Sequence, residues 1–333
     1  YMEAGYFIYV SAALGGGTGT GSINVLVDAI ADYLGKPVAA IASLPRPDEV
    51  ESLNAYNAMV ELIPKLNVLK RDDYGNSYRN LENVILLDNE KIVQDHTTNP
   101  EVQGITWDYY SNYKVASILH EWNVVTSLES DITLDSADLT NHILKSGGVL
   151  TFAKKKINLD DIKSRDHLLT EITSTYKGKN VLANGFNYKN DIRNMALVVV
   201  MPRERTDMLN QDTLEILRST MKDELPDIGF YPGFATHHSK RHAIVYTMAS
   251  MAGLPERARN MRQEAEELLA IRKKKEEQAS GFSLGEKIAH DRPISGPRRT
   301  GVNPFDRSSE QQVAATRVNP FEKPKSTNPF RKE

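Results

Sequence analysis

Residues Gly15-Gly16-Gly17-Thr18-Gly19-Thr20-Gly21-Ser22 carry the strongest structural signal in this 333-residue chain. They lie between an apolar run, residues 6–14, and a segment, residues 23–34, whose apolar side chains recur at helical spacing. Glycines permit positive φ and a close approach of backbone to a ligand, and the N-terminus of a following helix attracts anions. The two threonines and the serine add hydroxyl donors. We therefore predict a strand, a phosphate-binding loop and a helix, with a di- or triphosphate as the ligand.

The rest of the chain alternates strand-like and helix-like segments as far as residue 252. Further strands are expected at residues 38–44, 83–87, 148–152, 195–201 and 243–248. Helices are expected at residues 53–62, 107–122, 166–176 and 212–225. Such alternation is typical of βαβ units and a parallel sheet. We therefore expect an α/β fold, in which a second α/β unit with its own sheet follows the first.

Changes in composition divide the chain into four parts. We place a nucleotide-binding domain, including a central helix, at residues 1–125 and a second, smaller α/β domain at 126–252. A long C-terminal helix is expected at residues 253–280, since Pro255 suits a first helical turn. The tail, residues 281–333, holds ten basic and six acidic residues and few aliphatic ones, so it is predicted to be disordered.

The tail repeats the tripeptide Asn-Pro-Phe at residues 303–305, 319–321 and 328–330. Asn-Pro favours a turn that exposes the following aromatic side chain. This arrangement is typical of a linear motif that docks on a partner, and the alternative is a low-complexity spacer.

Charge and composition exclude several classes of function. With 41 Lys and Arg against 44 Asp and Glu, the net charge is −3, so we expect no direct sequence-specific binding to nucleic acid. The absence of Cys removes disulfides, thiolate metal sites and cysteine nucleophiles. No apolar run approaches the roughly 18 residues of a membrane span, and no signal peptide opens the chain, so a cytoplasmic location is expected. No resident metal site is predicted, because His237, His238 and His242 lack an acid at matching spacing.

The residues alone leave the identity of the phosphate compound open. No Lys follows the glycines, so the loop differs from the GxxxxGK[ST] loop of common NTPases. A dinucleotide-binding fold would place an acid at the end of the next strand, but the first acids there are Asp48 and Glu49, beyond Pro45. An NAD(P)-dependent Rossmann-type enzyme that binds its cofactor as a monomer remains an alternative.

In this setting the glycine stretch resembles the signature loop of the tubulin/FtsZ superfamily, and the later segments follow the order of that family. The resemblance covers about residues 6–279. It implies a Rossmann-like nucleotide-binding domain joined by a central helix to a second, smaller α/β domain. It also implies that the loop binds the phosphates of GTP or GDP, with Mg²⁺ accompanying the nucleotide. Four further residues match family contacts: Glu49 with the ribose, Asn89 with the sugar or base, Asn112 with guanine, and Tyr109 stacked on the base.

Residues 132–138 resemble the family's catalytic loop, written NxDxxD, which enters the nucleotide pocket of the next subunit. Asp135 and Asp138 match the acids that position the attacking water and a cation, whereas Thr133 replaces the usual Asn. The alternative for the two acids is helix capping in a surface turn. The resemblance therefore implies a GTPase that polymerises head to tail into dynamic filaments, because the adjacent subunit completes each active site.

Within the superfamily we favour the TubZ type, the plasmid- or phage-borne bacterial tubulins. The divergent catalytic loop, the long helix and the basic tail support this choice. It implies that the tail contacts a DNA-bound adaptor and that the filament segregates plasmid or phage DNA. The family also has strands and a first phosphate loop upstream of the glycine stretch, so we expect the N-terminal part of the domain to be missing here.

Two other interpretations stay within the fold. An FtsZ-like cell-division filament is the first, since residues 328–332 resemble the peptide by which FtsZ tails recruit membrane adaptors. A filament-associated adaptor that has lost hydrolysis is the second, and Thr133 is the feature that supports it.

Overall fold

The computed structural model describes residues 8–71, 73–128, 132, 134–178, 181–237 and 241–280. The predictions made for Tyr6, Thr133, His238 and the Asn-Pro-Phe repeats of residues 281–333 lie outside these residues. The compact unit described below ends at Ala279.

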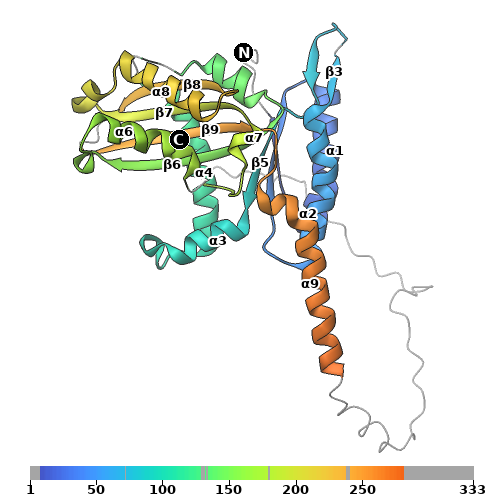
Figure 1. Cartoon of the computed structure of the whole chain (residues 1–333). Helices are drawn as coiled ribbons and strands as arrows, with labels where there is room; N and C mark the ends of the chain where they lie inside the picture. Colours follow the sequence, from blue (N-terminus) through green and yellow to red (C-terminus); the bar gives the residue numbers. More distant parts are fainter. Residues whose placement is uncertain are drawn as a thin grey trace, which may run out of the picture. The chain divides into compact units, whose positions relative to one another are not determined.

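In the described part of the chain, seven strands form one sheet in the order β1-β2-β5-β6-β9-β7-β8 (Figure 1). Strands β1, β2, β5 and β6 are parallel neighbours, β9 is antiparallel to both β6 and β7, and β8 is parallel to β7. In sheet order, the strands are β1 Ile8–Ala13, β2 Val38–Leu44, β5 Asn83–Asp88, β6 Gly148–Asn158, β9 His242–Met251, β7 Ile192–Pro202 and β8 Gly229–His237. The short strands β3 Leu69–Arg71 and β4 Ser77–Arg79 form a separate antiparallel pair.

The expected second sheet is not separate from the first. Strand β6 is eleven residues long, and its first residues pair with β5, in the register Asn83↔Gly148 to Ile85↔Leu150. The whole length of β6 from Val149 onward pairs with β9 on its other edge. Because β6 pairs with β5 on one edge and with β9 on the other, it joins strands β1, β2 and β5 to strands β9, β7 and β8 in one sheet.

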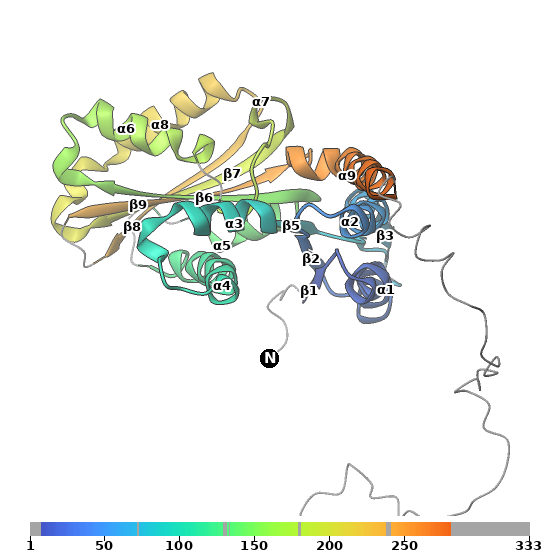
Figure 2. The same cartoon turned by 90° about the horizontal axis from the view of Figure 1, so that it is seen from below.

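Helices cover both faces of this sheet (Figure 2). The longer helices are α1 Gly17–Leu34, α2 Glu49–Leu62, α3 Asn89–Thr98, α4 Trp107–Val125, α6 Arg165–Thr173, α8 Gln211–Glu224 and α9 Glu256–Ser280. Shorter pieces are α5 Ser136–Asp138, α7 Tyr188–Asp191, a π-helix at Leu139–Leu144, and 3₁₀ turns at Ile63–Asn67, Pro100–Val102, Leu159–Asp161, Ser174–Lys177 and Arg203–Met208. None of the helices among the described residues combines the length and the apolar character needed to cross a bilayer.

Strand β7 shows why both faces of the sheet are covered. Val198 belongs to a buried cluster with Trp122 of α4, whereas its neighbour Val199 belongs to a cluster with Leu168 of α6 and Leu217 of α8. Successive side chains of a strand point to opposite faces, so a strand buried on both faces reads as a continuous apolar run. Residues 195–201 have that pattern, which explains why the sequence predicted this strand.

The start of α1 and the presence of β8 differ from the prediction for identifiable reasons. Helix α1 begins at Gly17, six residues before the predicted start, because the glycine stretch itself forms its first turn. Strand β8 was not predicted, since Gly229, Pro232 and Gly233 interrupt its pattern. Proline is tolerated in β8 because this strand lies at the edge of the sheet.

Candidate functional site

Three loops open at one edge of the sheet, where the parallel strands β1, β2 and β5 end. The registers Ala13↔Ser43 and Leu44↔Asp88 align the ends of the three strands. The loops that follow are the glycine stretch, residues 45–48 and the Asp88–Asn89 step into α3. In open α/β sheets, ligands bind outside the carboxyl ends of the strands. This edge is therefore the candidate nucleotide site.

The glycine stretch forms the N-terminus of an exposed helix. Gly16 is the N-cap of α1, no side chain caps the helix, and its first turn contains no acidic residue. Gly16, Gly17 and Thr18 are exposed to solvent. The first amide groups of α1 are thus available to an anion, and the helix dipole adds about half a positive charge there.

The glycines of this loop do not adopt positive φ, contrary to our expectation. The positive-φ glycines of the described residues all lie elsewhere in the chain. A Cβ on Gly19 would lie 2.1 Å from the carbonyl oxygen of Ala13, so glycine is needed there for α1 to pack on β1. A Cβ on Gly17 or Gly21 would meet no atom within 4 Å, so these positions leave open space at the loop surface.

Two of the three hydroxyl groups, those of Thr20 and Ser22, donate to carbonyl oxygens within the protein, so their role as phosphate donors stays a prediction. Thr20 Oγ1 lies 2.6 Å from the carbonyl oxygens of both Leu14 and Gly16. Ser22 Oγ donates to the carbonyl oxygen of Thr18 at 2.7 Å. Among the described residues, the hydroxyl of Thr18 makes no such bond. It is therefore the side chain of the loop best placed to meet a ligand.

Helix α2 holds the glycine loop through residues that the sequence analysis missed. Asn54 Nδ2 donates to the carbonyl oxygen of Gly15 at 2.9 Å, and a Cβ on Gly15 would lie 2.8 Å from Glu51 Oε2. The helix itself starts because the Asp48 side chain accepts hydrogen bonds from the amides of Val50 and Glu51. Polar residues three apart on one helix face, Glu51 and Asn54, were the available signal.

Glu49 and Asn89, predicted to contact ribose and base, both lie at this edge. Glu49 is the first residue of α2, and its carboxylate accepts a hydrogen bond from Arg272 of α9. Asn89 is the first residue of α3, and its Oδ1 accepts a hydrogen bond of 3.1 Å from Ser43 at the end of β2. The structure thus brings the ends of β2 and β5 together and ties Glu49 to the C-terminal helix.

Helix α9 also binds the loop that carries Asn89. Arg257 Nη1 donates to Asp88 Oδ1 at 2.6 Å, while its Nε and Nη2 each donate at 3.0 Å to the carboxylate of Glu264. Glu264 in turn accepts a 2.8 Å hydrogen bond from the fully buried Ser52 of α2. Burial lowers the pKa of Arg257, but the two carboxylates outweigh it, so the pKa is raised and the charge is kept. Sequence analysis predicted the helix but not these contacts.

Tyr109 and Asn112 lie on the first turns of α4 and are exposed. The Tyr109 ring stacks on Tyr113, with centroids 6.1 Å apart and planes within 7°. No hydrogen bond between the described residues joins Asn112 to the three loops. Both side chains are accessible, but their predicted contacts with a base stay predictions.

Asp135 and Asp138 flank the short helix α5, beyond the end of α4. The Asp135 side chain caps α5 by accepting a 2.8 Å hydrogen bond from the amide of Ala137. Asp138 Oδ1 lies 3.8 Å from Nε2 of His142, and both side chains are about half exposed. Asp135 therefore has the capping role that we gave as the alternative, and Asp138 faces solvent.

The acids and the glycine loop lie toward opposite edges of the sheet. The glycine loop follows the carboxyl end of β1, whereas Leu144, which ends the π-helix after Asp138, accepts a hydrogen bond of 2.8 Å from Asn83 at the amino end of β5. Asp135 and Asp138 also come after the C-terminal end of α4, while Asn112 lies near its N-terminal end. The two acids thus form a group apart from the glycine loop.

Comparisons with known proteins show which proteins this chain is similar to. Residues 121–262 match the family model for the C-terminal domain of TubZ-like proteins, which are tubulin/FtsZ-like. Over 329 residues the chain is 24% identical to the tubulin-like protein TubZ of Bacillus anthracis, a match that covers 92% of this chain and 71% of the relative. The TubZ of Bacillus cereus matches with the same identity and coverage.

Solved structures share the fold. A GTPγS-form protofilament of TubZ from Bacillus thuringiensis serovar israelensis superposes with a TM-score of 0.68 at 23% identity, covering 82% of this chain and 67% of that one. The GDP-bound monomer of CetZ1 from Haloferax volcanii gives a TM-score of 0.56 at 18% identity, covering 78% and 69%.

The fold is therefore that of the tubulin/FtsZ superfamily, which confirms the α/β fold class implied by the glycine stretch. Residues 121–262 match the TubZ-like C-terminal domain, and over most of its length the chain is similar to TubZ proteins.

Proposed function

We propose that this protein binds and hydrolyses GTP and polymerises head to tail into tubulin-like filaments. The observation that carries the proposal is that the glycine loop follows the carboxyl end of β1, whereas Asp135 and Asp138 lie toward the opposite edge of the sheet, near the amino end of β5. One subunit cannot apply both groups to one nucleotide, whereas two subunits stacked along a filament can. The TubZ relatives solved as GTPγS- and GDP-form protofilaments support the same interpretation.

In this proposal the exposed amides at the start of α1 and the Thr18 hydroxyl bind the phosphates. Glu49 and Asn89 contact the ribose and base, and Tyr109 and Asn112 of α4 contact the base. Glu49 must then share its carboxylate with Arg272 or release it. Mg²⁺ accompanying the nucleotide neutralises phosphate charge.

Asp135 and Asp138 of the adjacent subunit position the attacking water. Phosphoryl transfer needs little covalent chemistry from the protein, so positioning and electrostatics account for catalysis. Because the acids arrive only with the next subunit, hydrolysis depends on assembly, and the nucleotide state controls the stability of the filament.

The cargo is proposed from the TubZ likeness. We infer that the filament segregates plasmid or phage DNA through a DNA-bound adaptor, which the basic tail at residues 281–333 contacts. A pull-down of the adaptor–DNA complex with and without this tail tests the role. Equal recovery of the complex in both cases would contradict it.

The test of the function is right-angle light scattering of the protein at its natural full length, with phosphate release followed in the same sample. GTP, GDP and ATP are compared. We expect scattering to rise with GTP alone, above a critical concentration, and to decay as phosphate appears. No scattering change with any nucleotide would contradict polymerisation. Binding of a nicotinamide cofactor by the monomer would then favour the alternative of an NAD(P)-dependent Rossmann-type enzyme.

A further inference from the structure

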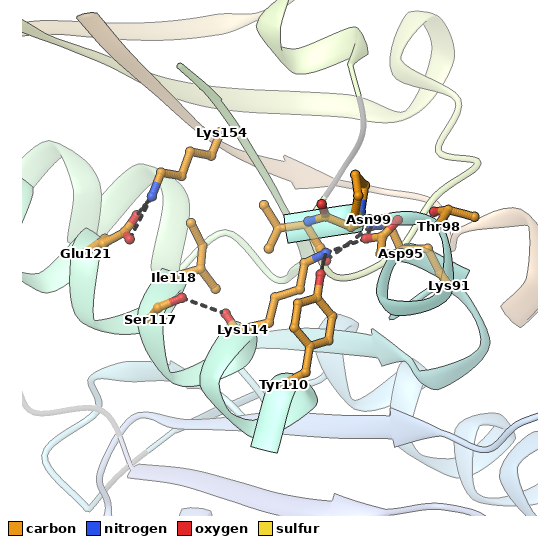
Figure 3. A pocket seen from close by; sticks show the side chains of 12 residues that line it. Lys91, Asp95, Thr98, Asn99, Tyr110, Lys114, Ser117, Ile118, Glu121 and Lys154 are labelled. Carbon is orange, nitrogen blue, oxygen red and sulfur yellow. Dashed lines mark hydrogen bonds and ion pairs between the residues drawn. The ribbon is translucent and has the colours of Figure 1, made fainter. Parts of the chain in front are cut away.

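A cavity of about 480 Å³ lies between helices α3 and α4, against strand β6 (Figure 3). Sites for small molecules usually have volumes of about 300–1,000 Å³. The cavity is lined by Lys91, Asp95, Thr98, Asn99, Pro100, Tyr110, Lys114, Ser117, Ile118, Glu121, Lys154 and Val181. None of the nucleotide-site candidates is among these residues.

Two lysines share one carboxylate at the centre of this cavity. The ammonium groups of Lys91 and Lys114 both donate to Oδ2 of Asp95, and Lys114 also donates to the Tyr110 hydroxyl at 3.4 Å. Lys91 is only 5% exposed. Lysines are rarely buried to this degree unless each has its own opposite charge, and Lys91 shares its carboxylate with Lys114. One carboxylate neutralises one of the two ammonium groups, so one positive charge remains.

The other charged pair of the cavity is balanced. Lys154 Nζ lies 2.8 Å and 2.7 Å from the two carboxylate oxygens of Glu121. Three lysines therefore face two carboxylates in this lining. The excess charge belongs to the Lys91–Asp95–Lys114 cluster.

The pKa of Lys91 reflects this excess. Burial lowers it, the charge of Lys114 lowers it further, and Asp95 only partly compensates, so the pKa falls to about 8. A second anion beside the cluster would remove the repulsion between the two ammonium groups. The hydroxyl of Tyr110 and the apolar side chains of Ile118 and Val181 line the space around it.

We propose that this cavity binds a small molecule through an oxyanion, a phosphate or a carboxylate, held by Lys91 and Lys114. The apolar wall accommodates the remainder of the ligand. This site is independent of the proposed GTPase activity, because neither the glycine loop nor the two acids contribute to it.

Isothermal titration calorimetry of the wild-type protein tests the site, with inorganic phosphate and malonate as separate probes at constant ionic strength. Each titration is run with and without saturating GDP, so that phosphate bound at the glycine loop is recognised by its loss. We expect GDP-insensitive binding of at least one probe, and the tighter probe identifies the oxyanion class. Absence of such binding for both probes overturns the proposal.

Three variants locate the binding. Lys114→Met is expected to weaken it about tenfold or more, since it removes a charge-assisted donor. Asp95→Asn is expected to tighten it, because the probe no longer competes with an internal carboxylate. The matched control is Lys65→Met, since Lys65 is 16% exposed and paired with Asp28 outside the cavity, much as Lys114 is 18% exposed and paired with Asp95.

The opposite signs of the first two effects separate binding from structural damage, which would weaken binding in both variants. If Lys114→Met does not fold, Asp95→Asn decides, because tighter binding supports the site and weaker or equal binding overturns it. Equal affinity of all variants for the probe also overturns it.

Discussion

Gly17 and Gly19 lie two residues apart in the glycine stretch, but only Gly19 is constrained by its neighbours. A Cβ on Gly19 would collide with the backbone of Ala13, whereas a Cβ on Gly17 would meet nothing. We expect Gly19→Ala to lower the free energy of unfolding by about 1–3 kcal/mol, as overpacking does. We expect Gly17→Ala to leave it unchanged or to raise it by up to about 1 kcal/mol, because alanine favours the helix.

Urea denaturation of the two variants measures these differences. Binding of a fluorescent GTP analogue to the stable variant Gly17→Ala then tests the site itself. We expect this binding to weaken, since the new methyl group occupies the open face of the loop. A stable Gly17→Ala variant with unchanged GTP affinity would indicate that the phosphates bind elsewhere.

Substitutions of Asp135 and Asp138 should differ in their effect on stability but agree in their effect on GTP turnover. Asp135 caps α5, so Asp135→Ala should lower the free energy of unfolding by about 1 kcal/mol. Asp138 faces solvent, so Asp138→Ala should change this free energy little. Both variants should lose GTP turnover by at least tenfold while keeping GTP binding. Unchanged turnover in Asp138→Ala would instead support the non-hydrolysing adaptor.

The lowered pKa of Lys91 predicts how the free energy of unfolding changes with pH. Its pKa is about 8 in the folded protein and near 10.5 in the unfolded chain, so the unfolded state holds more protons between these values. The contribution of Lys91 to the free energy of unfolding therefore rises as the pH increases from about 8 to 10.5. Urea denaturation across this range should show a smaller rise for Lys91→Met than for the wild type. Equal slopes would contradict the lowered pKa.

Among the secondary-structure elements, α9 forms side-chain hydrogen bonds with residues far from it in the sequence, namely Asp88, Glu49 and Ser52. Arg257 is 16% exposed and bonds Asp88, whose side chain is 9% exposed. Arg257→Ala leaves a buried carboxylate without its cation, and we expect the free energy of unfolding to fall by about 2–3 kcal/mol. GTP binding should weaken as well, because Asp88 caps the helix that Asn89 begins.

Arg262→Ala is the control on the same helix. Arg262 pairs with Glu266 on the surface, where both side chains are 62% exposed, so its loss should change stability little. A similar effect of the two substitutions would show that the Asp88 contact contributes no more than a surface ion pair.

The elements with a clear apolar period were predictable from the sequence. Residues 38–44 coincide with β2, and the predicted helix at 107–122 falls within α4. The start of α1 was missed because glycines and threonines read as a loop, although their amides form the first turn. The joining of the two sheets depends on the partner of β6, which local periodicity does not specify.

The candidate site was predictable to the extent that its residues lie in one loop or match a family motif. The contacts of Asn54 with Gly15, of Arg257 with Asp88 and of Arg272 with Glu49 were not predicted. Their partners are 39, 169 and 223 residues apart in the chain. Such pairings follow from the packing of α2 and α9. A local pattern can mark a polar helix face, as Glu51 and Asn54 do, but it does not specify the partner.

For the molecule as a whole, the central proposal is that two subunits share each active site. The glycine loop and the acids lie toward opposite edges of the sheet, so in a head-to-tail contact one subunit's loop meets the next subunit's acids. Such a heterologous contact repeats along an open filament and does not close into a dimer. Assembly and hydrolysis are then one coupled process.

Mixing two inactive variants tests this proposal most directly. Gly17→Asp places a carboxylate in the first turn of α1, where it repels phosphate, and Asp138→Asn removes a catalytic acid. We expect each variant alone to release almost no phosphate from GTP. In an equal mixture, about a quarter of the head-to-tail contacts pair an intact loop with an intact acid, so phosphate release should return. A mixture no more active than its separate components would contradict a site shared between subunits.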